Sequence, residues 1–199
     1  MSPAALSAFL LAGFALAGSP GPNTLSLAAA GAAFGPRPSL RYLLGLTFGM
    51  LVVMLLVGTG TVGLLLAIPG AAPAAAILAL VYFLYLAWRI ATAPPLTAAG
   101  AERSRPTARD GIVLSLLNPK GYIAMLALFS GPALIALRGV ADLALKIGLL
   151  LAIILGVNIV WLWAGGMLSS LFRRPRASRA LNIVFAALLL ASAVLLLPF

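Results

Sequence analysis

The stretch GSPGPNTLS, residues 18–26, places two prolines separated by a glycine where an apolar run would otherwise continue as one helix. No charged side chain occurs in the first 36 residues. Proline lacks an N–H and clashes with the carbonyl four residues earlier, so Pro20 is expected to leave the carbonyl of Leu16 without its helical donor. Pro22 has the same effect on Gly18. Unpaired backbone groups are tolerated in a membrane only where they are buried in protein or line a watery cavity. The stretch therefore predicts a broken helix with a polar point inside the membrane.

The composition of the whole chain agrees with a membrane location. Of its 199 residues, 63% are hydrophobic and 8% are charged, and the mean hydropathy is +1.17. An ordinary soluble domain carries about a quarter charged residues. A hydrocarbon core of about 30 Å needs roughly 20 apolar residues per helix, which allows about six spans. Backbone groups in lipid must bond within their own segment, so helices are expected rather than strands. The predicted spans are residues 4–34, 43–66, 74–90, 112–137, 147–171 and 181–197.

The charge of the chain indicates its orientation. The 13 basic side chains give a net charge of +10, but they are scattered between the apolar stretches. They form no aromatic-rich basic face, so we expect no nucleic-acid partner. Ten of them follow the first, third or fifth span, and only Arg138 and Lys146 lie on the opposite side. The positive-inside rule then predicts a multi-pass membrane protein, surrounded by the lipid bilayer, with both termini outside.

The same spans divide the chain into two halves, residues 1–93 and 111–199, joined by the charged cytoplasmic loop 94–110. We expect a single transmembrane domain over residues 1–199. Three spans per half force the halves into opposite orientations, as in inverted-repeat transporters. The second half has its own break, LNPKG at 117–121, in the matching helix. The pattern predicts an all-α fold of six transmembrane helices, arranged as two inverted three-helix repeats with broken first and fourth helices.

A new half-helix is expected to begin after each break, near residues 23–24 and near residues 121–122. Its first N–H groups would point inward at the positive end of the helix dipole. Pro119 is expected to free the carbonyl of Ser115. A zwitterionic amino acid suits such a place, with its carboxylate at the half-helix N-termini and its ammonium near the freed carbonyls. The alternative is two ordinary proline kinks that neighbouring helices heal.

Three further features lie inside the predicted spans. If its helix begins near Gly111, Lys120 comes nine residues later and lies roughly 13 Å deep at 1.5 Å per residue, near the bilayer centre. A lysine there costs at least ~2.5 kcal/mol. It is expected to receive a substrate carboxylate or to lose a proton during transport; snorkelling to the interface is the alternative. Asn158 either contacts substrate or bonds to another helix. Gly45 and Gly49 predict close helix packing within the protomer, with a homodimer contact as the alternative.

The residue types that are missing limit the chemistry. The chain has no cysteine and no histidine, so we expect no metal site and no cofactor. No acid–base set for a membrane enzyme is apparent. The acids are Glu102, Asp110 and Asp142, all in or beside loops, so a cationic substrate side chain would find no carboxylate in the membrane. Neutral amino acids are therefore favoured. A proton-coupled transporter with this sequence would have only Lys120 or the substrate itself as the proton carrier.

Two segments resemble signatures of the LysE/RhtB family of amino-acid exporters. SPGPNTLSLAAAGAAFGPRPSLRYLLGLTFG, residues 19–49, is similar to the first, and LLNPKGYIAMLALF, residues 116–129, is similar to the second. The resemblance covers nearly the whole chain and implies proton-driven efflux of amino acids from the bacterial cytoplasm, and therefore a place in the bacterial inner (cytoplasmic) membrane. The chain departs from the family in the first turn, where Pro36 and Pro38 flank Arg37 and Ser39 replaces a frequent glycine.

Residues and resemblance together predict one substrate-binding site for a small molecule, an amino acid or related zwitterion. The resemblance implies all but three of its members, and Thr24, Gly121 and Asn158 come from the residue argument. The candidate residues are Pro20, Gly21, Pro22, Asn23, Thr24, Asn118, Pro119, Lys120, Gly121 and Asn158. One alternative is a transporter of divalent cations, which Lys120 would repel, or of other small solutes. Another is a membrane scaffold that transports nothing.

Overall fold

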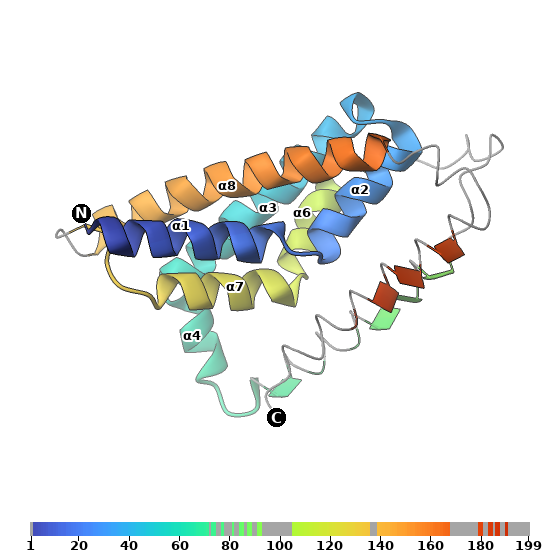
Figure 1. Cartoon of the computed structure of the whole chain (residues 1–199). Helices are drawn as coiled ribbons and strands as arrows, with labels where there is room; N and C mark the ends of the chain where they lie inside the picture. The colour runs from blue at the N-terminus through green and yellow to red at the C-terminus, as the bar shows by residue number, and fades with distance from the viewer. Residues whose placement is uncertain are drawn as a thin grey trace.

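A computed structural model describes residues 2–71, 105–135 and 139–167, together with isolated positions between 73 and 92 and between 179 and 190. This part of the chain is all-helical, with seven α-helices (Figure 1). They are α1 (Pro3–Gly18), α2 (Pro22–Phe34), α3 (Leu40–Gly58), α4 (Thr61–Leu66), α6 (Ala108–Leu116), α7 (Pro119–Phe129) and α8 (Val140–Met167), with a 3₁₀ turn, η1 (Arg37–Ser39), before α3. Most of the predicted spans 74–90 and 181–197 and of the loop 94–110 lies outside the described residues.

Both predicted helix breaks are present. The chain bends by 55° between α1 and α2 and by 62° between α6 and α7. The second helix of each pair begins on a proline, Pro22 or Pro119, one and two residues earlier than the sequence predicted. Proline suits the first position of a helix because its fixed φ is helical and its missing N–H would have no helical partner there. A proline therefore starts the second helix of each pair, while α1 already ends at Gly18, ahead of Pro20.

Two helices are long and apolar enough to cross a membrane unbroken, Arg37–Gly58 and Val140–Met167, and each bent pair can count as one more span. The described residues thus hold up to four spans. The prediction of one continuous helix over the span 43–66 is wrong. Helix α3 stops at Gly58, and Gly60 takes a positive φ of 80°, a conformation that ends a helix, before α4 begins.

Two other predicted boundaries also differ. Helix α7 ends at Phe129, before the predicted end at residue 137, and α8 begins at Val140, seven residues before the predicted start at 147. The early start of α8 brings Asp142 and Lys146 into the helix, where they pair with each other at 3.1 Å. Hydropathy alone excluded these two charged residues from the span, but their pairing lets the helix include them.

The broken helices of each half pack against the unbroken helix of the other half. Helices α1 and α2 lie along α8, and α6 and α7 lie along α3 (Figure 1). Glycines allow the close approaches: a Cβ on Gly45 of α3 would overlap the carbonyl of Ala108, and one on Gly165 of α8 would overlap the carbonyl of Ala28. A Cβ on Gly49 would lie 2.6 Å from Ser115 Cβ. The prediction of close packing within the protomer is confirmed for Gly45 and Gly49.

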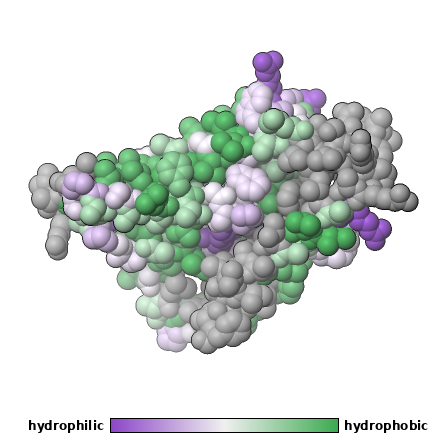
Figure 2. Space-filling view, viewed as in Figure 1, coloured by the Kyte–Doolittle hydropathy of each residue, from purple (hydrophilic) through white to green (hydrophobic). Residues whose placement is uncertain are grey.

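The outer surface is apolar, as expected for a surface in lipid. Large exposed hydrophobic side chains include Leu11 and Phe14 on α1, Phe48 on α3 and Val160 on α8. The face over α1 and α8 is mostly hydrophobic, with polar side chains in small patches (Figure 2). Apolar patches of this extent are rare on soluble monomers, whereas a lipid-facing helix requires them.

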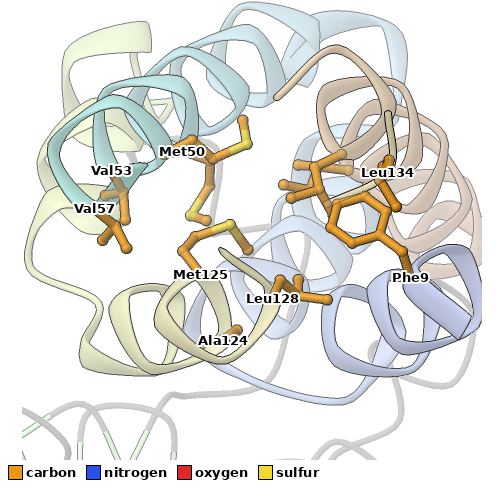
Figure 3. Packing of buried hydrophobic residues seen from close by; sticks show 11 residues of the cluster. Phe9, Met50, Val53, Val57, Ala124, Met125, Leu128 and Leu134 are labelled. Carbon is orange, nitrogen blue, oxygen red and sulfur yellow. The ribbon is translucent and has the colours of Figure 1, made fainter. Parts of the chain in front are cut away.

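The core that holds the breaks in place lies between α1, α3, α7 and α8. Phe9 of α1, Met50 and Val53 of α3, and Met125 and Leu128 of α7 converge there (Figure 3). All five side chains are buried. Two of them are methionines, whose unbranched thioether side chains adapt to irregular gaps. Met50 and Met125 also form part of the cavity described next.

Candidate substrate-binding site

The carbonyls that the prolines free have partners within the protein. The Leu16 carbonyl accepts from Ser19 Oγ at 2.9 Å, and the Gly18 carbonyl accepts from the indole N–H of Trp161 at 3.2 Å. The Ser115 carbonyl accepts from the Asn118 N–H at 3.2 Å. Each of the three carbonyls thus already accepts one hydrogen bond from the chain in this conformation, and a substrate ammonium near them could bind only as a second donor. Nearby groups of the chain satisfy them because an unpaired backbone group is costly in an apolar interior.

The two breaks meet through Lys120. Its ammonium donates to the Ser19 carbonyl at 2.8 Å, to Ser19 Oγ at 2.7 Å and to the Pro20 carbonyl at 2.9 Å. An ammonium group has three N–H donors, and the first break supplies an acceptor for each. The half-buried side chain thus crosses from the second break to the first instead of snorkelling to the interface. A substrate carboxylate could bind this ammonium only after Lys120 leaves these oxygens.

A chain of buried side-chain hydrogen bonds also links the breaks. Asn118 Nδ2 donates to Asn23 Oδ1 at 3.1 Å, and Asn23 Nδ2 donates to Ser115 Oγ at 2.9 Å. Ser115 Oγ in turn donates to the carbonyl of Leu46 on α3 at 2.9 Å. Asn118 Oδ1 is buried and has no hydrogen-bond partner among the described residues. Such an unsatisfied acceptor is rare in folded proteins and indicates a place for a donor from outside the chain.

These groups surround a cavity of about 60 Å³. Its polar wall consists of Ser19, Asn23, Thr24, Asn118, Lys120 and Asn158. Its apolar wall includes Met50, Ala124, Met125, Ile154 and Val157. The volume is well below the roughly 300–1,000 Å³ of drug-sized ligand pockets, so only a small solute fits unless the helices move.

Most of the candidate residues from the sequence come together at this cavity. Seven line it: Gly21, Asn23, Thr24, Asn118, Lys120, Gly121 and Asn158. The three prolines do not line it and shape the breaks instead, although the Pro20 carbonyl binds Lys120. Thr24 stabilises the first break, since its Oγ1 accepts from the Gly21 N–H at 2.9 Å.

Asn158 combines the two roles that its sequence position left open. Its Nδ2 donates to Thr47 Oγ1 at 3.1 Å, which ties α8 to α3. Thr47 Oγ1 donates onward to the Leu43 carbonyl at 3.0 Å. The Asn158 side chain also lines the cavity. It therefore bonds across helices and stands where it can contact a bound solute.

Sequence reasoning missed several members of the site. Ser19 lies in the quoted break and was detectable there, because a hydroxyl beside freed carbonyls is a natural partner for them. Met50 and Met125 gave no local signal, since an isolated methionine in an apolar span is ordinary. Ser115 was named only for its carbonyl, whereas its side chain joins α6 to Asn23 and Leu46.

A buried ion pair near the first turn of α8 was also missed. Asp142 and Lys146 are each less than a tenth exposed. One carboxylate oxygen of Asp142 pairs with Lys146, and the other accepts from the N–H groups of Leu134 at 2.6 Å and Ile135 at 3.1 Å. The pair therefore fastens the segment after α7 to α8. It adjoins a second cavity of about 390 Å³ that Gly131 also lines.

Two bent membrane helices that meet at a small cavity with polar walls, inside an apolar exterior, define a membrane transporter of small solutes. Comparison with known proteins gives the particular family. Residues 14–198 match the family model "LysE type translocator", and the chain belongs to this family. This confirms the resemblance seen in the two sequence signatures.

Curated relatives match over nearly the full length of both chains. A protein of Salmonella typhimurium named cysteine/O-acetylserine efflux protein is 36% identical over 202 aligned residues, which cover 98% of each chain. A protein of Escherichia coli K12 with the same name is 34% identical over 200 residues, again 98% of each chain. No solved structure matches the chain.

Proposed function

We propose that this chain exports small neutral amino acids or their close derivatives across the bacterial inner membrane by alternating access. The observation that carries the proposal is the cavity where both breaks meet, with the Lys120 ammonium and the unpartnered Asn118 oxygen in its wall. A zwitterion has a carboxylate, which the Lys120 ammonium can bind, and an ammonium, which can donate to the Asn118 oxygen. Membership of the LysE type translocators and the efflux function named for the relatives support the proposal.

The charge of the cavity favours a substrate with a neutral side chain. Lys120 is the one charged side chain among the described residues that line it. A cationic substrate would meet this charge with no carboxylate to offset it. Cysteine and O-acetylserine, which the names of the relatives specify, both have small uncharged side chains. The same positive charge, and the lack of a metal-binding acidic cluster among the described residues, argue against a divalent cation as substrate.

The proposed architecture is a single domain of six spans, with inverted repeats in residues 1–93 and 111–199. Similar bends in the two halves and the reciprocal packing of each broken pair on the other half's long helix support it. Both termini would face outward and the loop 94–110 inward. A homodimer would need a surface other than Gly45 and Gly49, because both glycines are buried against α6.

The proposed energy source is the proton gradient. The cavity wall holds no carboxylate and no imidazole among its described residues. Lys120 or the transported amino acid must then carry the proton, as the sequence already suggested. Lys120 is well placed for this role, because loss of its proton would weaken its three hydrogen bonds and loosen the contact between the breaks.

Efflux from living cells tests the function directly. Bacterial cells would be loaded with a panel of amino acids as dipeptides, and the external amino acids measured over time for the native chain, Lys120→Met and an empty vector. We expect faster release of small neutral amino acids with the native chain only. Membrane amounts of both proteins, measured by immunoblot, provide the control. If the native protein is present in the membrane and no amino acid leaves faster than from the vector, the proposal fails.

A further inference from the structure

We propose that Lys120 is a built-in occupant of the binding site for the substrate's ammonium group, and that a substrate must displace it. The inference rests on the proposed export function and describes how its site works. The lysine ammonium already sits in a cage of three oxygens, Ser19 O, Ser19 Oγ and Pro20 O, at 2.7 to 2.9 Å. A free primary ammonium group has the same three donors and fits the same acceptors.

The cage oxygens are all neutral. Two are backbone carbonyls and one is a hydroxyl, so the lysine charge is balanced by dipoles and not by a carboxylate. A cation that leaves neutral oxygens leaves no uncompensated charge behind, whereas one that leaves a buried ion pair does. By contrast, Lys146 pairs with Asp142 at 3.1 Å. Of the two lysines, Lys120 is therefore the one that can exchange its place with another cation.

The cavity offers an incoming ammonium a first contact next to the cage. Ser19 and Lys120 both line the cavity, as does Asn118 with its unpartnered buried oxygen. An amino acid can donate to Asn118 Oδ1 and then move its ammonium into the cage as Lys120 leaves. The released lysine then becomes free to bind the carboxylate of the same substrate. At the end of this exchange both charged groups of the substrate and the Lys120 ammonium have partners, which lowers the cost of holding these charges in a membrane interior.

Gly21 gives the lysine its access to the cage. A Cβ at this position would lie 2.8 Å from Lys120 Cδ and 2.9 Å from Lys120 Nζ, closer than a Cβ approaches an atom to which it is not bonded. The backbone of Gly21 is extended, with φ of −175°, which any residue adopts. Its small size, not its flexibility, is what the site requires, and the three atoms nearest to such a Cβ all belong to the side chain of Lys120.

The first test asks whether the cage binds a free ammonium ion. Lys120→Ala removes the three terminal methylenes and the ammonium, which together correspond to n-propylammonium. Thermal unfolding of the purified variant in detergent would be measured with n-propylammonium chloride, with n-propanol and with tetramethylammonium chloride. We expect only n-propylammonium to raise the unfolding temperature, and by more in the variant than in the native protein, where it must displace Lys120 and brings no carboxylate to bind the released lysine. No stabilisation of the variant by n-propylammonium, or equal stabilisation by tetramethylammonium, overturns the proposal.

The second test measures binding on the native protein and needs a variant only to assign its signals. The chain has two lysines, Lys120 and Lys146, so a protein labelled with ¹⁵N at the lysine side chains gives two ammonium signals. Lys146→Arg assigns them. We expect O-acetyl-L-serine to shift the Lys120 signal and to leave the Lys146 signal in place. N-acetyl-L-alanine, which has no ammonium, should shift neither.

The outcomes separate this inference from the proposed function. If O-acetyl-L-serine stabilises the native protein against unfolding but leaves the Lys120 signal unchanged, Lys120 stays in its cage when the substrate binds. The displacement is then wrong, while the proposed export function can still hold. If the signal shifts and n-propylammonium rescues Lys120→Ala, the displacement stands even where the efflux assay finds no export. Both tests measure binding, whereas the efflux assay measures transport.

Discussion

Asn118 stands at the N-cap of α7, where an asparagine side chain ordinarily accepts a hydrogen bond from the first turn of the helix. It makes no such bond. Its Nδ2 donates to Asn23 instead, and its Oδ1 stays buried without a partner at the cavity. The residue thus gives up the local bond that would stabilise its helix. The remaining acceptor is available to a water or to the ammonium of a substrate, which is the use that the proposed function assigns to it.

A small change at Gly21 provides a sharp test of the site. Gly21→Ala adds one methyl group within 2.9 Å of Lys120 Nζ and should push the lysine out of its oxygen cage. We expect export to fall at least several-fold, with the protein still present in the membrane, because alanine accepts the extended backbone of this position. The measurement is efflux normalised to membrane protein.

Gly18→Ala is the matched control for that variant. It lies three residues away, at the end of α1, and a Cβ there meets no atom within 4 Å. Its export should equal that of the native chain. Equal export from Gly21→Ala and Gly18→Ala would contradict the role of the lysine cage in transport.

At the scale of helices, glycine contacts decide which elements pack together. Gly45→Ala should destabilise the protein by about 1–3 kcal/mol, because the added methyl group overlaps the Ala108 carbonyl and pushes α6 from α3. Gly156→Ala on α8 meets no atom within 4 Å. It should be neutral or stabilise by up to about 1 kcal/mol through helix propensity. Unfolding of both variants in detergent checks this, and equal stability would refute the packing argument.

The ion pair of α8 works at the same scale. Asp142→Asn keeps an oxygen for the N–H groups of Leu134 and Ile135 but leaves the buried Lys146 without an opposite charge. Breaking a buried pair in this way costs about 3–5 kcal/mol. We expect a clear drop in the unfolding temperature.

A double variant separates the charge from the packing at this pair. Asp142→Asn combined with Lys146→Met removes both charges, so it should recover much of the stability lost in the single variant. If the double variant is as unstable as Asp142→Asn alone, the uncompensated charge of Lys146 is not the cause.

At the scale of the whole molecule, each long helix, α3 or α8, packs against the broken helices of the other half. The cavity lies where these two groups of helices meet. Rocking of one half against the other would open the cavity to one side at a time. Lys120 and the asparagine pair bind the halves to each other across this contact. Loosening these bonds in response to substrate would therefore couple binding to the motion.

The proposed orientation can be measured because the chain has no cysteine of its own. A cysteine at position 2 in Ser2→Cys should react with a membrane-impermeant maleimide in intact cells. A cysteine in Arg105→Cys should react only after the inner membrane is permeabilised, since the loop 94–110 is proposed to face the cytoplasm. Reversed labelling of the two variants would show that the termini are inside.

The sequence by itself determined the features that depend on local chemistry. An apolar composition with few charges requires a membrane, and a proline without an N–H interrupts a helix wherever it stands in its interior. The helical class, both breaks and the family therefore follow from local residue patterns alone. The boundaries were less accurate, because a paired charge such as Asp142 looks like a loop residue when only its hydropathy is considered.

The tertiary structure alone decided what the polar groups do. Lys120 and Ser19 are 101 residues apart in the chain, and Asn118 and Asn23 are 95 apart. No local pattern states that they meet. The lysine cage, the cavity beside the open oxygen of Asn118 and the methionines of its wall arise only when the two halves fold against each other, because the residues that form them are far apart in the chain.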